Sequence, residues 1–333
     1  MSRVAFITGI TGQDGSYLAE FLLEKGYKVI GLKRRTSIIS TDRVDHIFGS
    51  NKNLILEYYN LHDTGAFYRL LNKHKPCEVY NLGAQSHVRV SFEVPEETVA
   101  TIAMGTLRLL EAIRNTDPSI KFYQASSSEM FGDNPNYPFN EESKFMPSSP
   151  YACAKVFAHH LVKNYRESYG MYACSGILFN HESPRRGETF VTRKITMAAA
   201  KIAYQTMDKF YLGNLDAKRD WGFAGDYVEA MWLMLQQDEP DDFVLATGKT
   251  HTVREFLELV FKSAGLDDPD QYIEIDPRLF RPKEVPLLLG DYSKAKEKLG
   301  WEPKTNLQEL AKMMYDADLT LIAKELRIEG VFR

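Results

Sequence analysis

The chain has 333 residues, of which 44% are hydrophobic and 26% are charged, and its formal net charge at pH 7 is -4. This length and composition predict a globular protein with a large core, organised as two lobes or as one elaborated α/β domain. A slightly negative chain has no general attraction for a phosphate backbone, so we expect no nucleic-acid partner.

The distribution of apolar runs and cysteines indicates the cellular compartment. The first apolar run is too short for a secretory signal, and no later run is long enough to span a bilayer. The three cysteines occur singly, without the spacing of metal ligands, which is typical of a reducing compartment. We therefore expect a cytoplasmic protein without a metal site and without a membrane partner.

The N-terminal part has the pattern of a strand, a helix and a second strand. Residues 4–8 form an apolar run, residues 16–25 have helical periodicity that ends at Gly26, and residues 28–32 form a second apolar run. Strand-like and helix-like segments then alternate at residues 54–57, 64–74, 79–82, 96–114, 122–125, 151–169 and 172–178. This alternation predicts an α/β fold with a Rossmann-type, doubly wound parallel sheet.

The alternation ends after Phe179, which indicates a smaller lobe of mixed α/β structure. A helix that we expect Asp226 to cap returns the chain to the sheet domain. We predict that the sheet domain comprises residues 1–180 and about 220–270, and that the smaller lobe comprises about 181–219 and 271–333.

A glycine-rich turn lies directly after the first predicted strand and opens the first predicted helix. In this context, glycines let the backbone approach a pyrophosphate, and the amides at the helix N-terminus meet its charge. The spacing has one residue more between the first two glycines than the usual dinucleotide-binding pattern. The predicted cofactor-binding turn consists of Gly9, Ile10, Thr11, Gly12, Gln13, Asp14 and Gly15.

The residues after the second strand indicate which dinucleotide binds. An acidic residue at this point would bind the ribose of NAD, but the chain has Arg34, Arg35, Thr36 and Ser37. Guanidinium groups suit a phosphate dianion, so NADP is favoured over NAD. Residues after later strands add to the predicted cofactor site, namely Asn60, Leu61, Leu82, Gly83, Ala84, Gln85 and Ser86.

Tyr151 and Lys155 are four residues apart at the start of a predicted helix, so they share one face. A cation about 4 Å from a phenol could lower its pKa from about 10 toward neutrality and turn it into a base. Glu129, which follows the strand at 122–125, is more than a simple dehydrogenase needs. A carboxylate beside a hydride-transfer centre suggests removal of a carbon-bound proton next to a ketone, so oxidation, elimination and reduction form a coherent sequence.

Basic residues of the second lobe suit a diphosphate substrate. Asn180 and His181 end the sixth strand, where they could contact substrate and nicotinamide. These basic residues lie in segments expected to face the cofactor-binding lobe and are Arg185, Arg186, Arg193, Lys194, Arg219 and Arg281.

Five longer segments, at residues 9–15, 82–88, 179–187, 219–222 and 280–285, are more specific than any single motif. Through them the chain resembles the GDP-mannose 4,6-dehydratase family of the extended short-chain dehydrogenase/reductase superfamily, nearly from end to end. The resemblance implies a sheet domain that binds NADP, a smaller lobe that binds GDP-mannose, and self-association into a dimer or tetramer. It also implies formation of GDP-4-keto-6-deoxymannose, with NADP regenerated in each turnover.

The resemblance assigns roles to four catalytic residues. Tyr151 takes the proton of the sugar 4-hydroxyl while hydride passes to NADP, and Lys155 lowers the phenol pKa and holds the ribose. Ser127 binds the 4-oxygen, and Glu129 removes the C5 proton and assists the loss of water before hydride returns to C6. His181 and Arg186 join the cofactor site, and the expected substrate ligands are His87, Asn180, Arg193, Lys194, Arg219 and Arg281.

Five residues depart from the family pattern, among them Phe223 and Gly225, which replace more polar residues. Ser127, Asn60 and Glu97 stand where Thr, Asp and Tyr are usual, so we expect slower turnover and weaker retention of the cofactor. Two other functions remain open. A 4-epimerase or 4-keto reductase of the same superfamily would not need Glu129, and a non-catalytic NADP-binding sensor would not need an intact set of Tyr, Lys and Glu.

Overall fold

The computed structural model describes residues 3–37, 40–280, 283, 285 and 287–328. Its centre is a seven-stranded sheet in the order β11-β6-β5-β4-β1-β2-β3, in which every neighbouring pair is parallel. The strands are β1 (Val4–Thr8), β2 (Lys28–Lys33), β3 (Leu54–Tyr58), β4 (Glu78–Asn81), β5 (Lys121–Ser127), β6 (Ala173–Leu178) and β11 (Phe243–Leu245). The predicted Rossmann-type α/β fold is confirmed, and the strand order reverses direction between β1 and β4, where such sheets bind ligands.

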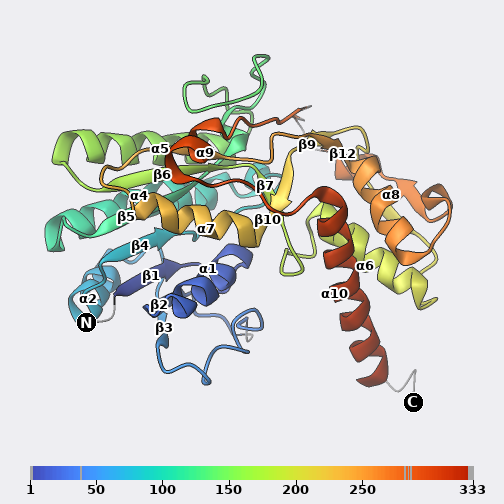
Figure 1. Cartoon of the computed structure of the whole chain (residues 1–333), viewed down its shortest axis with the longest axis horizontal. Helices are drawn as coiled ribbons and strands as arrows, with labels where there is room; N and C mark the ends of the chain where they lie inside the picture. The colour runs from blue at the N-terminus through green and yellow to red at the C-terminus, as the bar shows by residue number, and fades with distance from the viewer. Residues whose placement is uncertain (1–2, 38–39, 281–282, 284, 286, 329–333) are drawn as a thin grey trace.

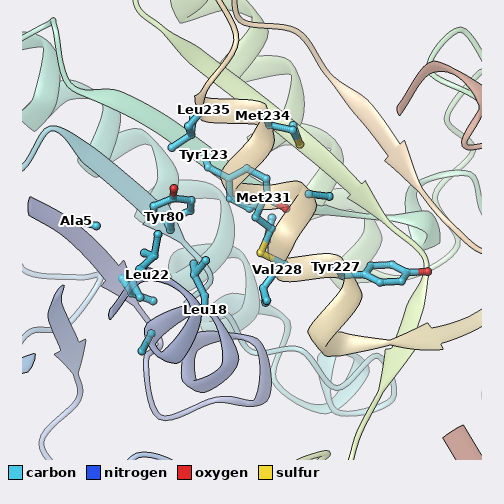
Figure 2. Close-up of a cluster of buried hydrophobic side chains, with 14 of the residues drawn as sticks. Ala5, Leu18, Leu22, Tyr80, Tyr123, Tyr227, Val228, Met231, Met234 and Leu235 are labelled. Carbon is cyan, nitrogen blue, oxygen red and sulfur yellow. The ribbon is translucent and has the colours of Figure 1, made fainter. Parts of the chain in front are cut away.

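Helices cover both faces of the sheet, so the central strands β4 and β6 are buried along their whole length. On one face, α7 packs against α1, and Figure 2 shows Met231 and Val228 of α7 close to Leu18 of α1. A second cluster fills the opposite face, with α4 packed between α2 and α5. The bounds of these helices are α1 (Gln13–Glu24), α2 (Thr64–His74), α4 (Pro95–Thr116), α5 (Pro150–Tyr169) and α7 (Ala224–Leu235).

A smaller lobe lies to one side of the sheet and has its own hydrophobic cluster (Figure 1). Three helices form it, namely α6 (Val191–Ala203), α8 (Val253–Ala264) and α10 (Leu307–Ile328). Short strands pair around it: β7 (Asn180–Glu182) with β10 (Trp221–Phe223), β8 (Phe210–Leu212) with β13 (Ile273–Ile275), and β9 (Lys218–Arg219) with β12 (His251–Thr252). Among the described residues, no helix combines the length and the apolar character needed to cross a membrane.

The packing of two helices bears on the division into domains. Helix α8 packs against α6 and α10, whereas α9 (Ser293–Leu299) packs against β11 and α7 of the sheet domain. The periodicity of a helix shows which face is apolar but not which partner covers it. We therefore propose to assign α8 to the smaller lobe and α9 to the sheet domain, and otherwise to keep the predicted division.

The prediction that Asp226 caps α7 is wrong. The helix begins at Ala224, with Phe223 in the capping position, so Asp226 lies inside the first turn. Its buried carboxylate Oδ2 instead accepts hydrogen bonds from the backbone amides of Lys304 and Thr305, each at 3.0 Å. Asp226 therefore fastens the loop before α10 to the sheet domain.

Replacing Asp226 with Ala should destabilise the fold by about 1–3 kcal/mol, because two backbone donors would lose their acceptor in a buried place. The free energy of unfolding in urea measures the effect. Asp216, whose side chain is exposed, supplies the matched control, since Asp216→Ala should change this free energy by less than about 0.5 kcal/mol. Equal values for the two variants would contradict the anchoring role of Asp226.

Candidate active site

A cavity with a volume of about 830 Å³ opens at the carboxyl ends of the sheet strands and extends to the smaller lobe. Most of the predicted site residues line it, although they come from distant parts of the sequence. These are Gly9, Thr11, Gly12, Gln13, Asp14, Gly15, Arg34, Thr36, Asn60, Leu61, Leu82, Gly83, Ala84, Gln85, Ser86, His87, Ser127, Glu129, Tyr151, Lys155, Asn180, His181, Arg186, Lys194 and Arg219.

Five predicted residues do not line this cavity, among them Arg185, which forms an ion pair with Glu20 at 2.6 Å, and one more lies outside the described residues. Ile10 is fully buried in the core, where its side chain fills the space that Gly31 leaves open. The Arg35 guanidinium lies 5.7 Å from the ring centre of Tyr58, and Ser37 is exposed. Arg193 is buried elsewhere, as described below, and the predicted substrate ligand Arg281 falls outside the described residues.

The glycine-rich turn is packed too tightly for side chains. Gly9 has a φ of +70°, and a Cβ atom there would lie 3.0 Å from the Cα of Gly83. A Cβ atom on Gly15 would lie 2.4 Å from the carbonyl oxygen of Gly9. Helix α1 begins directly after this turn, and within the described residues no side chain caps it. Its N-terminal amides are therefore suited to an anionic ligand.

Thr8 supports the turn from the end of β1. Its Oγ1 donates to Asn81 Oδ1 at 2.7 Å and accepts from the backbone amides of Leu82 and Gly83 at 3.0 and 2.9 Å. The sequence analysis did not identify Thr8, because an isolated Thr at the end of a strand is a common feature. Its hydroxyl fixes the second predicted cofactor loop relative to the first.

Arg43 is a second residue that the sequence analysis missed. It lines the cavity together with Arg34 and Thr36, and its guanidinium donates to the carbonyl oxygens of Arg185 and Thr11 at 2.8 and 3.4 Å. It lies ten residues beyond β2, in a segment without a strand or helix pattern. The basic residues directly after the second strand indicated a phosphate site, and Arg43 is a further basic residue of that site.

The reacting groups meet where β5 ends and α5 begins. Ser149 caps α5 by accepting a hydrogen bond from the amide of Ala152 at 3.1 Å, with Pro150 in the first turn. This start places Tyr151 on the cavity wall beside the Ser127 hydroxyl, which also accepts from the amide of Glu129 at 3.2 Å. A hydroxyl, a carboxylate and a phenol are thus gathered at one point.

The expected lowering of the Tyr151 pKa toward neutrality is wrong for the protein alone. Burial raises this pKa to about 12, the hydrogen bond to Ser127 lowers it in part, and the charge of Glu129 adds to the rise. Lys155 Nζ lies 5.7 Å from the ring centre of Tyr151 and donates to the carbonyl oxygen of Ala125 at 2.6 Å. Spacing along a helix predicted the shared face correctly, but it could not reveal this competing acceptor.

Lys155 is itself unusual, because its ammonium group is almost fully buried. Burial lowers its pKa from 10.5 to about 8, a change that the charge of Asp14 opposes. The side chain therefore remains largely protonated at neutral pH, at a cost in stability.

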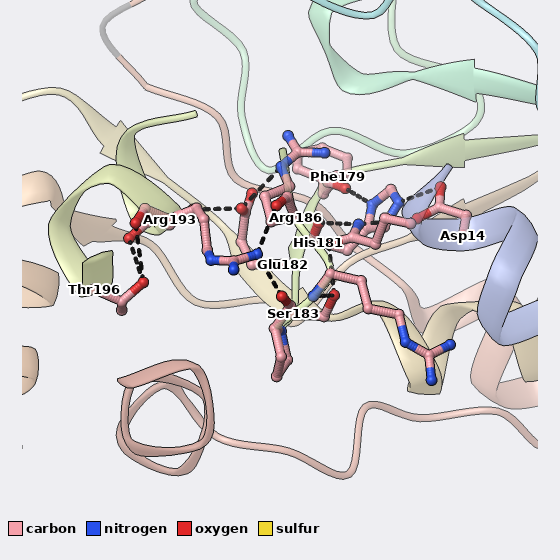
Figure 3. A network of polar contacts seen from close by, with 12 residues as sticks. Asp14, Phe179, His181, Glu182, Ser183, Arg186, Arg193 and Thr196 are labelled. Atoms are coloured by element: carbon pink, nitrogen blue, oxygen red, sulfur yellow. Dashed lines mark hydrogen bonds and ion pairs between the residues drawn. The ribbon is translucent and has the colours of Figure 1, made fainter. Parts of the chain in front are cut away.

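Arg193 does not line the cavity, and Figure 3 shows it joined by hydrogen bonds to the turn that carries Arg186. Its Nε donates to the carboxylate of Asp318 at 2.7 Å, and Nη1 donates to the carbonyl oxygens of Pro184 and Arg186, the latter at 2.9 Å. Arg186 in turn forms an ion pair with Glu182 at 3.0 Å. In place of direct contact with substrate, we propose that Arg193 positions the turn that presents Arg186 to the cavity.

Comparisons with known proteins identify the family of the chain. A family model described as GDP-mannose 4,6 dehydratase matches residues 6–314. The chain is 58% identical over 332 residues to GDP-mannose 4,6 dehydratase 1 of Arabidopsis thaliana, covering 97% of this chain and 91% of that protein. It is 53% identical over 364 residues to the GDP-mannose 4,6-dehydratase of Vibrio cholerae, covering 99% and 98%. The chain belongs to the GDP-mannose 4,6-dehydratase family.

The fold of this family member is shared with enzymes of other names. A crystal structure of UDP-glucose 4-epimerase from Thermotoga maritima, solved with UDP-glucose, superposes with a TM-score of 0.85 at 26% sequence identity. The match covers 96% of this chain and 99% of that one. Because the architecture is common to an epimerase and to this dehydratase family, the fold alone does not distinguish the two chemistries.

The buried ammonium of Lys155 predicts a pH dependence of stability. Its folded pKa of about 8 lies below the unfolded value of 10.5, so the unfolded chain binds more protons in this window and stability rises with pH. The shift corresponds to about 3 kcal/mol. In Lys155→Met, the free energy of unfolding should therefore rise less with pH than in the wild type. At pH 7 the variant should be more stable than the wild type by up to about 3 kcal/mol.

Urea unfolding of both proteins at several values between pH 7 and 10 checks this expectation. Because every other titrating group is common to both proteins, the difference between the two curves isolates Lys155. Parallel curves would show that the ammonium is not penalised by burial.

Proposed function

We propose that this protein is a GDP-mannose 4,6-dehydratase, a hydro-lyase that converts GDP-mannose into GDP-4-keto-6-deoxymannose and water with NADP as a regenerated cofactor. The observation that carries the proposal is the position of Glu129, a carboxylate on the cavity wall beside Ser127 and Tyr151. Epimerisation or reduction at C4 requires no base for a carbon-bound proton at this point. The intact set of Tyr, Lys and Glu also argues against a non-catalytic NADP-binding sensor.

The cavity fits NADP by several features of its wall. The glycine-rich turn and the N-terminus of α1 suit the pyrophosphate, and Arg34, Thr36 and Arg43 suit the additional phosphate that distinguishes NADP from NAD. Asn180 Oδ1 is buried and has no hydrogen-bond partner among the residues described, so a donor on a ligand would satisfy it. When bound, NADP supplies the acceptor and donor of the hydride.

The protein's own groups account for the movement of protons. Tyr151 accepts the proton of the sugar 4-hydroxyl as a phenolate, so its pKa of about 12 in the protein alone must fall when the ligands bind. Ser127 holds the 4-hydroxyl by a hydrogen bond to the same oxygen. Glu129 accepts the C5 proton that becomes acidic next to the 4-ketone, and the C6 hydroxyl leaves with a proton as water. C5 regains a proton when hydride returns to C6. Two protons are accepted and two are returned, so the residues recover their starting charges in each turnover.

The remaining wall of the cavity suits the nucleotide part of the substrate. Lys194 of α6 and Arg219 of β9 line it from the smaller lobe, and Arg219 is held in place by donating to the carbonyl oxygen of Val285 at 2.8 Å. Two cations facing one cavity suit a diphosphate. We assign NADP to the sheet domain and GDP-mannose to the smaller lobe, in a homo-oligomer located in the cytoplasm.

The first experiment is to incubate the purified protein with GDP-mannose and catalytic NADP, and to follow product mass and the absorbance of NADPH. Loss of one water without accumulation of NADPH is expected. A product of unchanged mass would favour an epimerase, a gain of two hydrogens that depends on added NADPH would favour a reductase, and no turnover despite bound cofactor would favour the sensor.

Glu129→Gln separates elimination from oxidation. This variant should still form the 4-keto sugar and bound NADPH in a single turnover, but water loss should be slower by about 10²–10⁴-fold because the base is gone. In D₂O, it should also fail to introduce deuterium at C5. Glu142→Gln, at an exposed carboxylate, is the matched control and should behave as wild type. Normal water loss by Glu129→Gln would refute the role of Glu129.

A further inference from the structure

The imidazole of His181 lies between two oxygen atoms that can only accept hydrogen bonds. Nδ1 is 2.7 Å from the carbonyl oxygen of Phe179, and Nε2 is 2.8 Å from Oδ2 of Asp14 (Figure 3). A carbonyl carries no proton, and the pKa of Asp14 is lowered to about 2, so its carboxylate is ionised. Both ring nitrogens must therefore donate, which is possible only for the protonated imidazolium.

The surroundings of His181 contain compensation for this buried charge. The ring stacks on Tyr227 of α7, with ring centres 4.8 Å apart and planes 21° apart, so the cation faces an aromatic ring. Asp14 of α1 attracts the positive charge, while burial and Arg186 of the turn after β7 oppose it. Attraction prevails, and the pKa of His181 is raised above its ordinary value.

Asp14 occupies an unexpected place for an acidic residue. It lies in the first turn of α1 and lines the cavity where the glycine-rich turn would meet a pyrophosphate. An uncompensated carboxylate there would repel an anionic ligand. The neighbouring Gln13 binds the segment around His181, as Asp14 does. Its Nε2 donates to the carbonyl oxygen of His181 at 3.0 Å, and its Oε1 accepts from the Ser183 hydroxyl at 2.8 Å.

We propose that His181 is a positioning residue held as an imidazolium, whose charge cancels that of Asp14 at the N-terminus of α1 and so allows an anionic dinucleotide to bind there. The second part of this inference rests on the proposed function, which supplies the dinucleotide. The protonation state does not, because it follows from the carbonyl of Phe179 and the ionised carboxylate of Asp14.

Nuclear magnetic resonance of the protein with ¹⁵N-labelled histidine tests the protonation state without any ligand. At a pH about one unit above the ordinary His value of ~6.5, exposed imidazoles are mostly neutral. His181, assigned through its loss in His181→Gln, should still show two protonated ring nitrogens. A neutral ring at this pH would overturn the proposal.

Cofactor affinity tests the role of the charge. His181→Gln keeps a donor but removes the cation, so the Kd for NADP should rise on the order of tenfold, the effect of one uncompensated charge at a helix terminus. Adding Asp14→Asn to this variant should recover most of the lost affinity, because the repelling carboxylate is then gone as well. Fluorescence titration with NADP measures both values, and thermal unfolding verifies that each variant is folded.

The outcomes separate three explanations. A double variant that binds NADP no better than His181→Gln would show that the imidazole contacts the cofactor directly or acts only in folding, and would overturn the charge-cancelling role. Failure of the wild-type protein to bind NADP would refute the proposed cofactor but would leave the resonance result untouched. Recovery by Asp14→Asn is the result that a purely structural His181 could not produce.

Discussion

A row of hydrogen bonds across three strands fixes the edge on which the site depends. Register places Thr8 of β1 beside Asn81 of β4, and Asn81 beside Gln124 of β5. Their side chains are buried and joined, with Asn81 Nδ2 donating to Gln124 Oε1 at 2.8 Å. Because buried polar groups must be paired, a slip of any of these strands would leave several of them unsatisfied. The glycine-rich turn, the loop after β4 and the reacting groups after β5 thereby keep their relative positions.

Buried charges lie on the cavity wall or next to it, and three of them are each held by a partner group. Lys155 is fixed by the carbonyl oxygen of Ala125, His181 by Asp14, and Arg193 by Asp318. Removing ions from water is costly, and such arrangements contribute little to net stability. Their effect is to orient donors before any ligand arrives. A site of this kind is preorganised at the expense of stability, as expected where activity and stability compete.

The sequence alone predicted those features that repeat or lie close together in the chain. Strand and helix periodicity yielded the parallel sheet, and the capped start of α5 placed Tyr151 and Lys155 on one face. Features that depend on distant partners could not be predicted. Arg193 resembled a substrate ligand because its partner Asp318 is 125 residues away, and Asp14, the second acceptor of His181, is 167 residues away. The local sequence pattern predicts the helix or strand on which a side chain lies. Burial and pairing with distant residues decide which groups it contacts and whether it is charged.

The chemistry of this family requires little beyond the common fold. Ser127 ends β5, and a single 3₁₀ turn at Ser128–Met130 brings Glu129 to the same cavity. The backbone amide of Glu129 donates to the Ser127 hydroxyl, so the residue that we propose to hold the sugar oxygen also fixes the start of the acidic side chain. In the proposed mechanism, this one carboxylate adds a base for a carbon-bound proton to a site for hydride transfer. Fold similarity to an epimerase and a distinct reaction are therefore compatible, because the difference can be confined to a single turn after β5.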